Sequence, residues 1–351
     1  MATEQTILEV QNLSIAYPIS IGVVRAVEGV SFTLADGEAL GIVGESGCGK
    51  STMGLSILKL LRPPGRVTEG KIIYRGTDIL SMDDKTLLRL RGQNISMIFQ
   101  NPLTSLNPLF TVERHFLETI HFHDPTMPRD KALAAVGRML ETLGIERKRL
   151  KEYPHQLSGG MRQRIMIGLA LIMNPDILIA DEPTTSLDVI VEAGFTELLA
   201  SLRRMYKLSI ILITHNLGLV AEIADRIAVM YAGNIMEVAT AEDIFARPLH
   251  PYTRGLIDCV PNILLEQKEL VTMPGSPPDL VEPPRGCRFA PRCPRVMPVC
   301  REKAPALLEH APSHRAACWL YQDHGNASTE PTAPASAGRA GSGAPAARGG
   351  A

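Results

Sequence analysis

The sequence has little that would hold the chain in a membrane or on a nucleic acid. No uninterrupted apolar run approaches the roughly 20 residues that a membrane-spanning helix needs. The first residues, 1 to 6, have neither a basic start nor an apolar stretch, so we expect no export signal and a cytosolic protein. Lysine and arginine number 36 against 37 aspartates and glutamates. Without a net positive charge, nucleic acid is not an expected partner.

A glycine-rich segment between residues 44 and 52 has the form G-x-x-x-x-G-K-[ST] of a phosphate-binding loop. Glycines let successive N–H groups surround phosphates, and the following helix adds the positive end of its dipole. An apolar strand at 39–43 and an apolar helix at 51–61 are expected on either side. The expected ATP-binding residues of this loop are Gly44, Ser46, Gly47, Cys48, Gly49, Lys50, Ser51 and Thr52.

Two adjacent carboxylates end a later apolar run. Residues 177–180 are all apolar and lead into Asp181 and Glu182. In parallel α/β sheets ligands bind at the carboxyl ends of the strands, so we expect Asp181 to join Ser51 in binding Mg²⁺. Glu182 is then the candidate general base for the attacking water.

With these motifs and the run Ser158-Gly159-Gly160-Met161-Arg162-Gln163, the chain resembles the ATP-binding subunits of ABC transporters. The resemblance implies that Ser158, Gly159 and Gly160 cap the γ-phosphate of ATP bound by an opposite subunit. A helix N-terminus with bare N–H groups suits that task. ATP and Mg²⁺ are the implied cofactors, and a dimer of two such subunits is the implied working unit.

The resemblance also implies roles for four single residues. Two of them follow expected strands, one lies within a strand and one lies at the dimer interface. Gln100 would contact Mg²⁺ and the attacking water, and His215 would contact the γ-phosphate. Asp188 belongs to a loop that crosses the interface, and Tyr17 would stack on adenine. Residues 101–108 correspond to the place where a membrane subunit docks, with a simple surface connector as the alternative.

Three C-terminal stretches narrow the resemblance to importers of dipeptides, oligopeptides and nickel: residues 230–237, 244–253 and 286–319. We therefore expect an ATPase that powers peptide import at the cytoplasmic face of the cell membrane. The implied partners are two membrane permease subunits, a second and paralogous ATP-binding subunit and, indirectly, an extracytoplasmic substrate-binding protein. An ATPase for nickel or another small solute, or a soluble ABC protein acting on ribosomes or DNA, is the alternative.

The expected fold is an α/β phosphate-loop ATPase core with a mixed sheet, an antiparallel β layer and a helical subdomain. The 351 residues have room for one such domain and an appendage. We expect strands at 7–17, 24–34, 69–74 and 209–214, and helices at 82–91, 130–143, 189–206 and 217–224. The expected divisions are 1–260 for the ATPase domain with its helical subdomain at about 101–175, 261–324 for the Cys-rich region and 325–351 for a disordered tail.

The C-terminal region suggests a separate chemistry, because four of the six cysteines lie close together: Cys287, Cys293, Cys300 and Cys318. In a cytosolic chain such a cluster indicates metal binding before disulfides. Seven nearby lysines and arginines would offset the negative charge of a [4Fe–4S] cluster. Zinc, with His314 as a further ligand, and unligated packed thiols are the alternatives. Cys48, near a helix N-terminus, is either an acidic thiol or, as we favour, a spectator.

Overall fold

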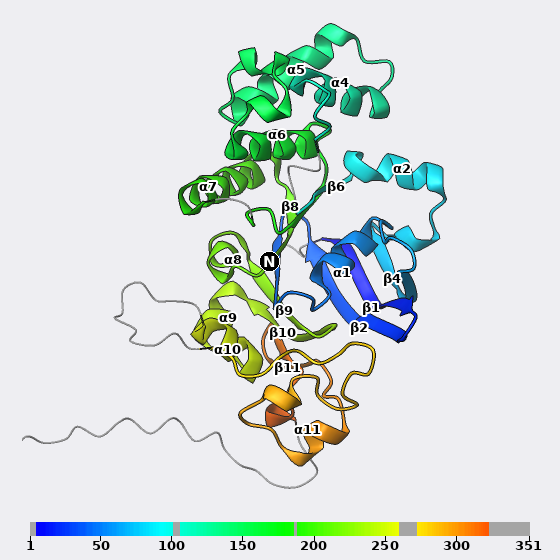
Figure 1. The fold of residues 1–351 in the computed structure, drawn as a ribbon, viewed down its shortest axis with the longest axis vertical. Coiled ribbons are helices and arrows are strands. Elements are labelled where there is room, and N and C mark those ends of the chain that lie inside the picture. Colours follow the sequence, from blue (N-terminus) through cyan, green and yellow to red (C-terminus); the bar gives the residue numbers. More distant parts are fainter. Residues whose placement is uncertain (1–4, 101–105, 186–187, 260–271, 323–351) are drawn as a thin grey trace, which may run out of the picture.

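The computed structural model describes residues 5–100, 106–185, 188–259 and 272–322. Two sheets organise them (Figure 1). The first has the order β2-β1-β4-β5 and is antiparallel. Its strands are β1 (Thr6–Ile19), β2 (Gly22–Ala35), β4 (Arg66–Tyr74) and β5 (Thr77–Asp78).

The second sheet has the order β11-β12-β10-β9-β3-β8-β7-β6, and the five strands from β9 to β6 run parallel. Parallel pairing is expected here because helices connect these strands. The strands are β3 (Ala39–Val43), β6 (Ile95–Ile98), β7 (Ile177–Asp181), β8 (Ser209–Thr214), β9 (Arg226–Tyr231), β10 (Asn234–Thr240), β11 (Leu308–Ala311) and β12 (His314–Ala316).

The central strands are buried on both faces, and their alternating side chains build two cores. On β7, Leu178 and Ala180 join the core on one side, whereas Ile177 and Ile179 join the core on the other. The first core includes residues of the helical layer, and the second includes residues of β1, β2 and α1 (Lys50–Ile57). The mixed sheet with an antiparallel β layer agrees with the fold expected from the sequence.

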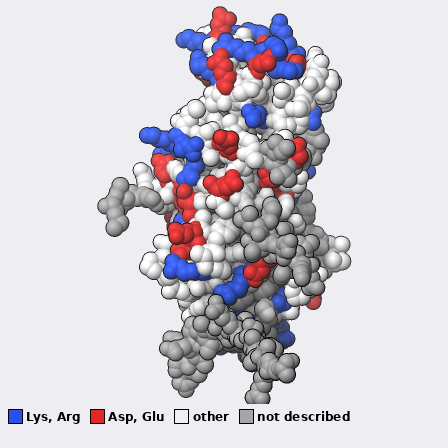
Figure 2. Space-filling view, turned by 90° about the vertical axis from the view of Figure 1, so that its left-hand side faces the viewer, with Lys and Arg blue, Asp and Glu red and all other residues white. Residues whose placement is uncertain are grey.

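Helices α4 (Val112–His123), α5 (Arg129–Thr142) and α6 (Gly159–Leu171) form a layer at one end of the molecule (Figure 1). Figure 2 shows lysines, arginines and acidic residues interspersed at that end. The other helices are α2 (Asp84–Gln93), α7 (Val189–Tyr206), α8 (Leu217–Ile223), α9 (Ala241–Ala246), α10 (Pro251–Asp258) and α11 (Pro298–Glu302). Within the described ranges, no helix has the length and apolar character needed to cross a membrane.

Several boundaries differ from those expected. β1 and β2 run past the expected strand ends at residues 17 and 24, and Pro18 lies within the pairing, opposite Val23. Strand β4 begins at Arg66, opposite Ala16, so it does not extend alongside Pro18. On that side of β1, no strand among the described residues therefore needs a hydrogen bond from Pro18, which has no N–H. Helix α1 ends at Ile57, before the expected end at residue 61, because Lys59 adopts a left-handed conformation.

The C-terminal region adds to the main sheet and core. β12 pairs with β10, and β11 pairs with β12. Cys287, Phe289 and Cys300 pack into the same core as the central strands. The rest of this region has little regular structure beyond α11 and single 3₁₀ turns.

Stability should depend on pH through His250, which precedes α10. Its ring is buried, and burial lowers its pKa from 6.5 to about 3. The folded protein therefore keeps His250 neutral at pH values where the unfolded chain protonates it, so the free energy of unfolding should fall as the pH drops from 6.5 toward 3. His250→Asn keeps an acceptor for the Tyr252 N–H but cannot titrate. The free energy of unfolding of this variant should fall less steeply than that of the wild type, and the two slopes should differ by about 1.4 kcal/mol per pH unit. Urea unfolding across this range measures both slopes, and equal slopes would contradict the assignment.

Candidate active site

The expected catalytic residues meet at one edge of the main sheet. β3, β8, β7 and β6 are neighbours and run parallel, so their carboxyl ends lie side by side. The phosphate-binding loop follows β3, Glu182 follows β7 and His215 follows β8. Gln100 follows β6 with only Phe99 between them. Residues up to 171 positions apart in the sequence are thereby brought to one site.

The phosphate-binding loop needs its glycines. Gly44, Gly47 and Gly49 have φ values of 154°, 79° and 104°, which other residues rarely adopt. A Cβ atom at Gly44 would lie 2.0 Å from the Met230 carbonyl oxygen, and one at Gly49 would lie 2.2 Å from that of Ala26. A Cβ at Gly47 would meet nothing within 4 Å. The loop is thus tightly packed at both ends and open at Gly47, where a phosphate can approach.

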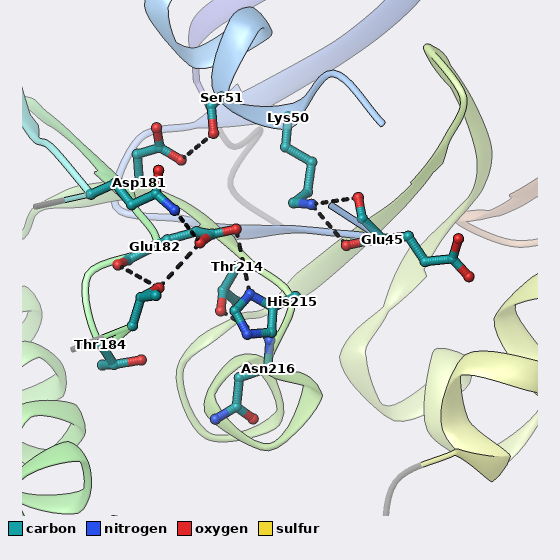
Figure 3. A network of polar contacts seen from close by, with 12 residues as sticks. Glu45, Lys50, Ser51, Asp181, Glu182, Thr184, Thr214, His215 and Asn216 are labelled. Atoms are coloured by element: carbon teal, nitrogen blue, oxygen red, sulfur yellow. Dashed lines mark hydrogen bonds and ion pairs between the residues drawn. The ribbon is translucent and has the colours of Figure 1, made fainter. Parts of the chain in front are cut away.

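The Lys50 side chain lies along this loop and is 4% exposed. Its ammonium donates to the carbonyl oxygens of Gly44 and Glu45 at 2.7 and 3.0 Å (Figure 3). Cys48 is buried as well, and burial raises the pKa of its thiol although the Lys50 charge opposes this. Of the two possibilities for Cys48, the raised pKa favours the spectator role over an acidic thiol.

Ser51 and Asp181 provide a pair of oxygen donors. The Ser51 hydroxyl donates to the Asp181 carboxylate at 2.8 Å (Figure 3). Burial raises the pKa of Asp181, the Ser51 hydrogen bond lowers it, and the nearby Glu182 charge raises it further. Such hard oxygen ligands suit Mg²⁺, which binds proteins through one or two carboxylates and completes its shell with phosphates and water. The two residues therefore fit the metal that an ATP site implies.

Glu182 is the centre of a second cluster, and it is 8% exposed. One carboxylate oxygen accepts from Gln100 Nε2 at 2.7 Å and from the Thr185 hydroxyl at 3.1 Å. The other lies 3.4 Å from Nδ1 of His215 (Figure 3). Its backbone has a left-handed φ of 45°, a conformation that costs a non-glycine residue about 1–2 kcal/mol. The Glu182 N–H donates to the Ile213 carbonyl at 2.7 Å, which holds this conformation.

The other expected ATP contacts lie elsewhere. Ser158 caps α6, where its hydroxyl accepts from the Met161 N–H at 3.3 Å, and a Cβ at Gly159 would meet nothing within 4 Å. In Figure 1 α6 belongs to the helical layer and lies apart from α1. Asp188 caps α7 by accepting from the Val191 N–H. The expected docking segment falls mostly on residues 101–105, outside the described ranges.

Tyr17 lies on β1 and is half-buried. A Cβ at Gly65 would lie 2.3 Å from the Tyr17 ring, so one part of the ring packs against that glycine backbone. In this contact Tyr17 acts as a packing residue. Its stacking on adenine stays a prediction.

Three residues beside the site were not predicted as part of it. Thr185 bonds Glu182, as described above, and the Glu45 carboxylate is held by Arg292 through two N–O contacts of 2.8 and 3.0 Å. Glu45 occupies a variable position of the loop motif, and Arg292 lies 247 residues away from it. No local sequence pattern connects the two residues.

The four clustered cysteines are free, and all but Cys293 are buried. Burial raises the pKa of Cys287 to about 11 and that of Cys318 to about 12, and the other three thiols add to the effect at Cys318. Within the described ranges, however, no three His, Cys, Asp or Glu side chains are placed to hold a metal ion. His314, considered as a zinc ligand, instead bonds the buried Glu237 carboxylate at 2.7 Å. The iron–sulfur prediction therefore gains no support from the described residues.

Comparison with known proteins gives two family matches. Residues 27–185 match the family described as ABC transporter, and residues 236–300 match the one described as oligopeptide/dipeptide transporter, C-terminal region. The Bacillus subtilis (strain 168) dipeptide transport ATP-binding protein DppD is 50% identical, covering 90% of this chain and 95% of its own length. The Salmonella typhimurium oligopeptide transport ATP-binding protein OppD is 46% identical, covering 89% and 93%.

A solved structure shares the fold as well. It is a dimeric, post-hydrolysis ATP-binding cassette bound to ADP and phosphate, and it matches 67% of this chain and 99% of its own at 27% identity. The TM-score is 0.60. The matched share corresponds in size to the ATPase core without the C-terminal region.

Proposed function

Because the chain belongs to the ATP-binding proteins of dipeptide and oligopeptide ABC transporters, we propose that it hydrolyses ATP to power peptide import across the cytoplasmic membrane. Membership confirms the family and the ATPase activity expected from the sequence. The C-terminal match favours peptides over the nickel and non-transport alternatives. The observation that carries the proposal is the meeting of Gln100, Glu182 and His215 beside the Ser51–Asp181 pair.

We assign the following roles to the site. The phosphate-binding loop offers N–H groups from Gly44 to Thr52, and Lys50 turns its ammonium from loop carbonyls to the outer phosphates. Mg²⁺, when bound by Ser51 and Asp181 with Gln100 nearby, neutralises charge on the phosphates. Glu182 takes the proton of the attacking water. His215 and Gln100 orient the groups around that water, and their contacts with Glu182 support this assignment.

The proposed site is completed by a second ATP-binding subunit. Ser158, Gly159, Gly160 and Asp188 would act on nucleotide held by the partner, since the N-terminus of α6 lies apart from the chain's own loop (Figure 1). Tyr17 would stack on adenine with the part of its ring that does not face Gly65. We propose that the partner is a paralogous chain, as the family resemblance suggests, and that closure of the pair drives the permease subunits.

The proposed division of the chain keeps residues 1–260 as the ATPase domain, with about 101–175 as its helical subdomain, and 261–324 as the C-terminal region. The contribution of β11 and β12 to the main sheet means that the last unit is docked on the first. Residues 325–351, the proposed disordered tail, lie outside the described ranges. The proposed location is the cytoplasmic face of the membrane, at the permease subunits.

For the cysteine cluster, a [4Fe–4S] cluster remains a proposal that no function above depends on. The other three thiols raise the pKa of Cys318, which supports the proximity of all four, although no three of the described side chains are placed to hold a metal ion. Iron, sulfide and zinc analysis of anaerobically purified protein decides between a cluster, zinc and free thiols.

Copurification followed by an ATPase assay tests the proposed function. The chain, expressed with its permease subunits and partner ATPase, should purify as one complex whose ATP hydrolysis rises with peptide and binding protein. Stimulation by nickel instead of peptide, or no association with membrane proteins, would refute the proposal.

A further inference from the structure

The second residue of the phosphate-binding loop, Glu45, faces two ways. Its backbone carbonyl accepts from Lys50, on the side where Ser51 and Glu182 lie (Figure 3). Its carboxylate points away from those residues (Figure 3). The motif leaves this position free, so the direction of the side chain must be explained by what it contacts.

The carboxylate is held by Arg292 of the C-terminal region. Two guanidinium nitrogens donate to its two oxygens at 2.8 and 3.0 Å, a bidentate pair. One of them also lies 3.2 Å from the Tyr231 hydroxyl oxygen, and Arg292 Nε donates to the Pro274 carbonyl at 2.9 Å. The Arg292 side chain is 5% exposed, and the hydrogen bonds to Glu45 raise its pKa. Every nitrogen of the guanidinium is therefore engaged, while the Glu45 side chain stays 24% exposed.

The backbone of Glu45 is held from the same direction. Its N–H donates to the Tyr252 hydroxyl oxygen at 2.9 Å. Tyr252 lies on α10, is completely buried and packs on Tyr231 and Phe289, with ring centroids 4.6 and 5.3 Å apart. Phe289 precedes Arg292 by one 3₁₀ turn. One packed unit thus holds both the main chain and the side chain of a single loop residue.

From these contacts we infer that Arg292 is a positioning residue for ATP, which links the C-terminal region to the phosphate-binding loop. It fixes the loop backbone that presents N–H groups and carbonyls at Gly44 and Glu45. It also neutralises a carboxylate that would otherwise repel a triphosphate bound to the same loop. The inference rests on the ATP site proposed above. Because coupling between sites is reciprocal, bound ATP should in turn stabilise the docked C-terminal region.

The test is a double-mutant cycle on ATP affinity in the full-length chain. Arg292→Met removes the charge and retains much of the apolar stem, leaving the Glu45 carboxylate unpaired beside the loop. We expect the Kd for ATP to rise about tenfold, within the range typical of coupled sites. Adding Glu45→Gln to Arg292→Met should recover the part of that loss that the repelling charge causes, while the part caused by the lost loop contact should remain. The cycle includes Glu45→Gln alone, and a purely structural role for Arg292 predicts that ATP affinity changes only where thermal stability changes.

Arg226→Met is the matched control. Arg226 pairs with Glu38 at 2.8 Å, and this pair, like Arg292–Glu45, has one side chain that is 24% exposed and one that is 8% exposed or less. Arg226 begins β9, at the opposite end of the parallel strands from the loop. We expect this variant to lose thermal stability while it binds ATP like the wild type. It therefore separates general destabilisation from loss of loop positioning.

Lys50→Met separates failure of the inference from failure of the proposed site. If Lys50→Met binds ATP normally, the site itself is wrong. If Lys50→Met loses ATP while Arg292→Met binds it like the wild type, the inference is overturned and the site stands. Equal weakening of Arg292→Met with and without Glu45→Gln overturns the charge-neutralising part of the inference.

Discussion

Replacing Glu182 with glutamine should preserve ATP binding and abolish turnover. The amide keeps the size of the side chain and an oxygen for Gln100 and Thr185, whose bonds to Glu182 measure 2.7 and 3.1 Å. It cannot accept a proton from the attacking water. General-base catalysis contributes about 10²–10⁴-fold to a rate, so kcat should fall by at least about a hundredfold. The variant subunit and its partner should then remain closed on ATP.

Steady-state ATPase assays and size-exclusion chromatography with ATP measure the two effects. Glu38→Gln is a suitable control, because this buried carboxylate pairs with Arg226 far from the site, and its turnover should stay close to that of the wild type. Wild-type turnover in Glu182→Gln would remove the general-base assignment. Loss of ATP binding in that variant would instead show a structural role.

Lys50→Met should remove most of the affinity for ATP. The Lys50 ammonium is a buried charge whose described partners are loop carbonyls and, at 3.8 Å, the Cys48 sulfur. Contacts with anionic phosphates would replace part of this network by charge-assisted hydrogen bonds, each worth about 1.5–3 kcal/mol. Two such bonds correspond to a Kd that is at least about a hundredfold higher in the variant. Methionine fills much of the same space, so the fold should persist.

Lys59→Met is the matched control for this variant. Lys59 follows α1 and its ammonium also donates to two carbonyls, those of Leu80 and Met82, both at 3.2 Å. The Lys59→Met variant should bind ATP with the same affinity as the wild type. Equilibrium binding of a fluorescent ATP analogue compares the two, and equal affinities would contradict the role given to Lys50.

Features carried by local patterns could be predicted from the sequence. The bounds of α7 and β8 are those expected, because an apolar period and clear caps mark them. The meeting of Gln100, Glu182 and His215 follows from one rule, that carboxyl ends of parallel strands share an edge. Motif order along the chain was sufficient to apply that rule.

Features carried by distant contacts could not be predicted. Arg292 and Glu45 have no periodic or motif relation, and only the docking of the C-terminal region brings them together. The pairing of β12 with β10 was missed for the same reason, since β12 is three residues long and irregular chain surrounds it. At Cys48 the nearby helix N-terminus suggested an acidic thiol, but the sequence did not show that the thiol would be buried, which raises its pKa.

The most direct test of the central claim is ATP-driven uptake of a labelled dipeptide into liposomes that contain the complete transporter. The account predicts that peptide uptake requires ATP on the side of the membrane where this chain lies and is lost in Glu182→Gln. Nickel should not be taken up in place of the peptide. Peptide uptake that persists in Glu182→Gln and Lys50→Met, or nickel uptake without peptide uptake, would contradict it.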